Sequence, residues 1–163
     1  MNRIVNAVAN EGTFDNDSRV LARRAFELVL DAEIKRAIRS QTFLTLVMLQ
    51  ARREWDGITI TADEGIVEDV ARIVGNEIRD TDPLGLAGSG GLSLVLLDAD
   101  FESSRKVVDR VIQRIVSYEF LTPLHISMGV ACYPTHAVDS QSLRTRALTQ
   151  PALSWRREPE MRH

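Results

Sequence analysis

A run of glycines near the middle of the sequence is the feature whose residue types most directly suggest chemistry. Gly88, Ser89, Gly90 and Gly91 lie between two apolar runs, and glycine-rich loops can cradle phosphate groups with their backbone N–H groups. Such phosphate loops lead into a helix and end in Gly-Lys-Ser/Thr, whereas a second apolar run follows here. We therefore expect a permissive β-hairpin turn at this point of the chain.

Few other side chains have the spacing of a reactive site. His125 and Ser127 lie two residues apart and face the same side of a predicted strand, but the sequence offers no third partner for nucleophilic catalysis. The single cysteine, Cys132, excludes an internal disulfide and a multi-cysteine zinc site. Trp55 and Trp155 could stack on a ligand or contact a partner, although packing in the core or against the tail is the expectation.

The composition indicates one folded domain. The chain has 163 residues, and 44% of them are hydrophobic, which is enough to build a core. The net charge of -3 disfavours a basic surface for nucleic acid. The sequence shows neither a signal peptide nor an apolar run of the roughly 20 residues that span a membrane, so we expect a cytoplasmic protein. The domain is expected at residues 15–149, with tails at 1–14 and 150–163.

Hydrophobic periodicity predicts an α/β (α+β) fold. Apolar residues recur at helical spacing in residues 18–39, 66–80, 101–119 and 140–148. Apolar runs predict strands at residues 43–49 and 124–132, and on both sides of the glycines at 83–87 and 92–97. The pattern between residues 55 and 61 is short and stays ambiguous. This order predicts a central mixed or antiparallel sheet with helices packed on it.

Three segments together resemble one family. Residues 15–26 are similar to the motif D-x-L-T-G-L-x-N-R-R-x-F at the Asp, the paired Arg and the Phe. Residues 33–39 resemble E-L-x-R-A-x-R, and residues 126–131 resemble the strand S-I-G-V-A. In this order the segments resemble the GGDEF domain of bacterial diguanylate cyclases, which join two GTP molecules into cyclic di-GMP. The resemblance covers residues 15–148 and implies a nucleotide-cyclase-like fold.

The same resemblance implies that the catalytic motifs are degenerate. The motif G-G-D-E-F reads G-S-G-G-L at Gly88, Ser89, Gly90, Gly91 and Leu92. The family's metal motif D-x-D-x-F-K falls on residues 50–55, where Gln50 and Arg52 replace its two aspartates. Magnesium in phosphoryl transfer needs carboxylate oxygens, and Gln50, Arg52, Gly90 and Gly91 supply none. We therefore expect no metal site, no cofactor and no cyclase activity.

Other acidic residues nearby are expected to have structural roles. Asp63 and Glu64 are expected to begin a helix, where the helix dipole favours negative charge. Asp98 and Asp100 are expected to leave the hairpin at the end far from its turn.

One family motif survives five residues before Gly88. Arg79 and Asp82 resemble the ends of the R-x-x-D inhibitory site, which binds product away from the catalytic centre. A guanidinium can donate two hydrogen bonds to a phosphate or to a guanine edge, and a carboxylate can accept from guanine N–H groups. The alternative is structural, with Arg79 solvated at a helix end and Asp82 in a turn before Pro83.

The resemblance leads to two functional hypotheses. The first is an inactive GGDEF-like signalling domain that binds cyclic di-GMP through Arg79 and Asp82 and passes its ligand state to an unidentified protein partner. The second is a ligand-independent interaction scaffold or a homodimerisation module. Neither hypothesis involves nucleic acid or a membrane span.

Overall fold

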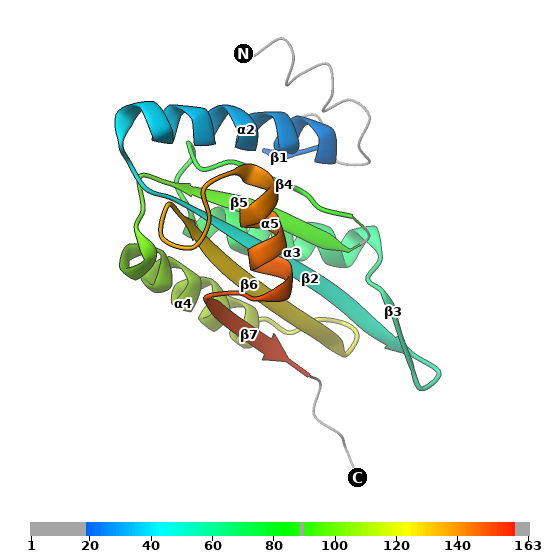
Figure 1. Ribbon diagram of the computed structural model, residues 1–163. Helices are drawn as coiled ribbons and strands as arrows, with labels where there is room; N and C mark the ends of the chain where they lie inside the picture. Colours follow the sequence, from blue (N-terminus) through cyan, green and yellow to red (C-terminus); the bar gives the residue numbers. More distant parts are fainter. Residues whose placement is uncertain (1–18, 89, 159–163) are drawn as a thin grey trace.

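A computed structural model of the protein describes residues 19–88 and 90–158. Its strands and helices form a seven-stranded sheet covered by helices on both faces (Figure 1). The strands are β1 (Val20–Leu21), β2 (Leu44–Trp55), β3 (Ile58–Thr61), β4 (Leu84–Leu86), β5 (Gly91–Leu97), β6 (Leu124–Tyr133) and β7 (Leu153–Arg157). The helices are α2 (Arg23–Ser40), α3 (Glu64–Glu77), α4 (Phe101–Ser117) and α5 (Ser140–Thr149). The predicted fold class is confirmed.

Strand β2 is the centre of the sheet. The strand order is β1-β4-β5-β2-β6-β7, and β3 pairs with the last part of β2. Both long neighbours of β2 are antiparallel to it, and Gln50 lies opposite Gly91 on β5 and Ser127 on β6. Among the described strands only β1 and β4 are parallel, so the sheet is mixed. Residues 44–49 are buried with the exception of Met48, as the apolar run predicted.

The two faces of the sheet have separate cores. Helices α3 and α4 cover one face, where Val70, Val74 and Ile115 are buried. Helices α2 and α5 cover the other, where Leu30 and Leu143 are buried (Figure 1). Because side chains alternate along a strand, odd-numbered residues of β2 face α3 and α4, and even-numbered residues face α2 and α5. Gln50 and Arg52 therefore lie on the face of α2 and α5.

Three of the helices begin at aspartate N-caps. The side chains of Asp63, Asp100 and Asp139 each accept a hydrogen bond from a backbone N–H in the first turn of α3, α4 and α5. The predicted structural role of Asp63 is thus confirmed, and Glu64 lies in the first turn of α3. None of the helices within residues 19–88 and 90–158 has the length and apolar content needed to cross a membrane.

The ambiguous segment at residues 55–61 is a β-hairpin. A two-residue turn of Asp56 and Gly57, with φ angles of 50° and 79°, joins β2 to β3. Positive φ at both turn positions is typical of a type I′ turn, whose twist matches that of the flanking strands. The four residues of β3 were too few for the alternation of the sequence to identify.

The expectation of a loose tail from residue 150 onward is wrong for residues 153–157. This segment is strand β7, which pairs antiparallel with β6 from Val130 to Ile126. Leu153 and Trp155 pack against the core on the α3 and α4 face, whereas the alternating Ser154 and Arg156 are exposed. The sequence already contained this alternation, but Pro151 and the arginines obscured it. The predicted tail at residues 1–14 lies outside the described residues.

The close packing of α5 on β6 generates a prediction about stability. A Cβ atom added at Gly129 would lie 2.0 Å from the carbonyl oxygen of Ala147. We expect Gly129→Ala to lower the free energy of unfolding by about 1–3 kcal/mol, because helix α5 must move away from the sheet. Urea unfolding measures this change.

Gly65→Ala is the matched control. Gly65 lies in α3, and an added Cβ would meet only the Asp63 carboxylate at 3.5 Å. Alanine has the higher helix propensity, so this variant should be as stable as the parent or more stable by up to about 1 kcal/mol. Equal loss of stability in both variants would contradict the packing described.

Candidate functional site

The glycine run forms the turn of the β4–β5 hairpin. Gly88 and Gly90 have φ angles of 62° and 72°, and the backbone N–H of Ala87 donates to Gly91 O at 2.9 Å. The predicted hairpin and its permissive turn are therefore confirmed. Leu92 is buried in the core, and Ser89 lies outside the described residues.

The turn approaches strand β2 so closely that two of its positions have no room for a side chain. The N–H of Ala51 donates to Gly90 O at 2.9 Å. A Cβ atom at Gly90 would lie 2.6 Å from the Ala51 carbonyl oxygen, and one at Gly91 would lie 1.9 Å from the Ala87 carbonyl oxygen. Both obstacles are backbone atoms, which cannot swing aside as a side chain can. Carboxylates therefore do not fit at residues 90 and 91 in this conformation.

The groups beside the turn do not fit a magnesium ion. Gln50 lies directly opposite Gly91, and Arg52 lies two residues further along the same face of β2. An amide oxygen is a weak ligand without charge, and the exposed guanidinium of Arg52 would repel a divalent cation. Within the described residues, no group of three or more His, Cys, Asp or Glu side chains could hold a metal ion.

Asp98 and Asp100 lie at the other end of β5, as expected. Leu97, the last residue of β5, pairs with Leu44 at the start of β2 rather than with the end near the turn. Asp100 caps α4 and accepts from the Ser103 N–H at 2.8 Å. The hydrogen bonds from Ser103 hold the pKa of Asp100 below its ordinary value. Both carboxylates are thus remote from the turn.

Asp82 is built into the fold. Its side chain is 3% exposed, and its two oxygens accept hydrogen bonds from the N–H groups of Leu97 and Arg79, each at 3.1 Å. These bonds tie the segment between α3 and β4 to the end of β5. The structural alternative predicted for Asp82, a turn residue before Pro83, describes this arrangement.

Arg79 is more accessible than Asp82. Its side chain is 61% exposed, its Nε lies 3.5 Å from Asp82 Oδ2, and its guanidinium donates to the carbonyl oxygen of Leu97. Arg19 anchors the same segment from the other side, because its guanidinium donates to the carbonyl oxygens of Gly75, Arg79 and Asp82. Only the Arg79 half of the motif therefore presents its polar atoms to solvent.

A groove of about 690 Å³ lies on the α2 and α5 face, beside the glycine turn. Its floor contains Gln50 and Ser127, and its rim includes Gly88. Helices α2 and α5 form its walls, and β7 borders it through Arg156. The volume is within the range of about 300–1,000 Å³ that is usual for ligand sites.

The groove is positively charged. Its charged lining residues are Arg23, Arg144, Arg156 and Glu27, a net of two positive charges. Glu27 Oε1 lies 3.4 Å from both Arg23 Nε and Arg144 Nη1, so one carboxylate serves two guanidiniums. The Nε of Arg144 is buried and finds no acceptor among the described residues. The excess of guanidiniums over carboxylates in the lining favours an anionic ligand here.

The sequence did not identify this groove. Its arginines come from α2, α5 and β7. Arg23 of α2 is far in the chain from Arg144 and Arg156, and no local motif links the three. His125 and Ser127 lie on the same face of β6, as predicted. His125 Nε2 lies 2.9 Å from Glu54 Oε1. The expectation that both tryptophans pack is right for Trp155 and wrong for Trp55, which is 61% exposed.

The role of Asp82 in the fold can be tested by stability. Asp82→Ala leaves two partly buried N–H groups without their acceptors, so it should lower the free energy of unfolding by about 2–4 kcal/mol. Arg79→Ala removes a guanidinium that is itself 61% exposed and should cost about 0–1 kcal/mol. Asp80→Ala, at an exposed neighbour, is the control. If Asp82→Ala leaves the free energy of unfolding unchanged, Asp82 has no structural role and is free to bind a ligand.

Comparison with known proteins relies on structure. No protein-family model matches the sequence, and no curated protein matches it either. A DGC protein from Thermotoga maritima has a similar structure, with a TM-score of 0.69, 17% identity, and coverage of 82% of this chain and 96% of that one. The active GGEEF domain of a diguanylate cyclase from Vibrio cholerae has a TM-score of 0.64 and 17% identity, covering 77% of this chain and 85% of that one.

A third similar structure was determined with a ligand. The GGDEF domain of DgcB from Caulobacter crescentus, in complex with c-di-GMP, has a TM-score of 0.62 and 16% identity, and the match covers 80% of this chain and 84% of that one. These likenesses agree in their fold, and the resemblance seen in the sequence points the same way. The chain has the fold of a GGDEF domain.

Proposed function

We propose that the chain is a catalytically inactive GGDEF-fold domain that acts as a receptor for cyclic di-GMP. The loss of catalysis is supported by the glycine turn, where backbone atoms occupy the space of carboxylate side chains at Gly90 and Gly91. Gln50 and Arg52 at the neighbouring strand add no acidic oxygen. Without acidic ligands, magnesium is not held against the charge that develops in phosphoryl transfer.

The groove between α2 and α5 is the binding place that the geometry supports best. The groove has a net charge of two positive units. This charge complements cyclic di-GMP, which has two negatively charged phosphodiester groups. A nucleoside triphosphate carries more negative charge and normally binds with magnesium, whereas the carboxylate that lines the groove, Glu27, is already paired with Arg23 and Arg144. The net positive charge of the groove lining is the single observation that carries this placement.

The Arg79 and Asp82 motif is the second candidate place. The exposed guanidinium of Arg79 could turn from Leu97 O toward a phosphate or a guanine edge. Asp82 would have to exchange two backbone hydrogen bonds for those of a ligand. Binding at this place would therefore depend chiefly on Arg79.

An interaction module that needs no ligand is the second candidate function. The observation in its favour is the pair of exposed apolar side chains, Trp55 and Ile58, on the β2–β3 hairpin. Exposed apolar surface of this kind is typical of a contact with another polypeptide.

The loss of catalysis is tested by incubation with GTP and Mg²⁺ or Mn²⁺, followed by chromatographic separation of the nucleotides. We expect no cyclic di-GMP, because the chain lacks acidic metal ligands beside the turn. The active GGEEF domain from Vibrio cholerae is the positive control. Metal-dependent formation of product by this chain would contradict the proposal.

The receptor function is tested by calorimetric titration with cyclic di-GMP. Arg144→Ala should weaken binding by about 10- to 100-fold, because it removes charge-assisted hydrogen bonds. Arg146→Ala is the matched control, since Arg146 lies on the same helix but lines a different hollow. Its effect should stay within about 2-fold.

Arg79→Ala separates the two candidate places. Binding in the groove predicts an unchanged affinity for this variant. Loss of binding in Arg79→Ala together with full binding in Arg144→Ala would indicate that the ligand binds at the Arg79 motif and not in the groove. A parent chain that releases no heat would remove the receptor function altogether.

A further inference from the structure

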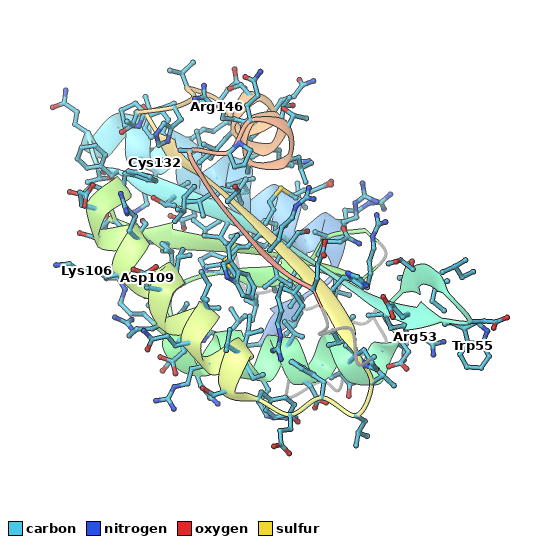
Figure 2. The ribbon with its side chains drawn as sticks, turned by 90° about the horizontal axis from the view of Figure 1, so that it is seen from below. Arg53, Trp55, Lys106, Asp109, Cys132 and Arg146 are labelled. Carbon is cyan, nitrogen blue, oxygen red and sulfur yellow. The ribbon has the colours of Figure 1, made fainter. Side chains whose placement is uncertain are left out.

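The β2–β3 hairpin extends beyond the rest of the sheet as an arm, formed by residues 52–61 (Figure 1). The pairing of β2 with β5 ends at Gln50, and its pairing with β6 ends at Arg53. Glu54 and Trp55 therefore pair only with β3. Figure 2 shows Trp55 on the outer part of this arm and Arg53 nearer its base.

One face of the arm carries two exposed apolar side chains, Trp55 and Ile58. Trp55 lies opposite Ile58, and Arg53 lies opposite Ile60, so these four side chains share a face. Trp55 and Ile58 are 61% and 60% exposed. The guanidinium carbon of Arg53 lies 5.5 Å from the centre of the Trp55 ring, a cation–π contact that orients the indole.

The outer edge of β3 is open over three residues. Among the strands of residues 19–88 and 90–158, β3 pairs with β2 alone. At its far end the glycine turn lies close, since a Cβ at Gly90 would be 3.2 Å from Thr61 Cγ2 and 3.5 Å from the Ala62 nitrogen. The edge is therefore covered from Thr61 onward and open from Ile58 to Ile60. An open strand edge is a template for another strand.

The hydrogen-bond pattern of the hairpin determines which backbone N–H and C=O groups of β3 point away from β2. A two-residue turn closes on a hydrogen-bonded pair, here Trp55 and Ile58, and hydrogen-bonded pairs alternate along an antiparallel ladder. The N–H and C=O of Ile58 and Ile60 thus point toward β2. Those of Thr59 point outward, at the centre of the open edge.

We propose that the open edge of β3 pairs with the same edge of a second copy of this chain, antiparallel and centred on Thr59. Residues opposite one another in an antiparallel pair share a face. Within the open segment, Ile58 and Ile60 point to one face and Thr59 to the other, so Ile58 must lie opposite Ile58 or Ile60 of the second copy. Only the register centred on Thr59 uses all three open residues. It makes two N–H to C=O hydrogen bonds between the two Thr59 residues.

This register is chemically self-complementary. Ile58 of each copy lies opposite Ile60 of the other, and Trp55 flanks the isoleucines on both sides of the two-fold axis. The charged side chains of the arm, Arg52, Arg53, Glu54 and Asp56, sum to zero, so two arms do not repel each other. The contact is small, and small interfaces give weak, concentration-dependent association. It uses neither the groove nor Arg79, so it stands apart from the proposed receptor function.

Analytical ultracentrifugation of the full chain tests the proposal. The weight-average mass should rise from 18.3 kDa toward twice that value between about 10 µM and about 1 mM. Thr59→Pro removes the outward N–H without breaking a bond to β2, and should hold the chain at the monomer mass. Thr59→Ala keeps the N–H and should still associate. A parent chain that is monomeric throughout overturns the proposal and leaves the edge to a different polypeptide.

A cysteine substitution tests the register independently of the proline variant. The Cα atoms of a hydrogen-bonded antiparallel pair lie about 5.5 Å apart, within disulfide range. Thr59→Cys should form a covalent dimer under mild oxidation, visible on a non-reducing gel. Thr61→Cys, on the same face but off the axis, should not, and the native Cys132 is fully buried. Equal crosslinking of both variants, or none with Thr59→Cys, contradicts the register.

Discussion

The backbone contact between the glycine turn and strand β2 decides what this face of the molecule can do. Ala51 donates its N–H to Gly90 O, and the neighbouring carbonyl oxygens lie where side chains at residues 90 and 91 would begin. A turn held this closely offers backbone and no carboxylate. The end of β2 beside it carries Gln50 and Arg52, so the place has amide and guanidinium character. A groove with this chemistry suits an anion that needs no magnesium.

Much of the fold could be predicted because its signals are local. The four helices have apolar stripes at helical spacing, and the hairpin at residues 84–97 has a glycine turn between apolar runs. The elements that were missed are short and lie at the margins of the sheet. Strand β3 has four residues. The alternation of apolar and polar residues in β7 is hard to recognise because Pro151 precedes it and two arginines lie within it. Their positions are fixed by pairing with β2 and β6, which a single segment does not reveal.

The candidate site was predictable only in part. The sequence showed which residues stand at the signature positions, because that information is linear. It did not show that Asp82 is buried and accepts two backbone hydrogen bonds, since that depends on Leu97 from a different strand. Nor did it show the groove, whose arginines Arg23, Arg144 and Arg156 meet only when α2, α5 and β7 pack around the sheet.

Paramagnetic relaxation tests most directly the claim that no divalent metal ion binds between the glycine turn and β2. Mn²⁺ can be added to ¹⁵N-labelled protein together with cyclic di-GMP, and the amide signals of Ala51 and Gly91 followed by NMR. Because the turn and the neighbouring residues Gln50 and Arg52 offer no acidic oxygen, the account predicts that both signals keep their intensity. Selective broadening of these two amides by substoichiometric Mn²⁺ would place a metal ion between the turn and β2, and would contradict the account.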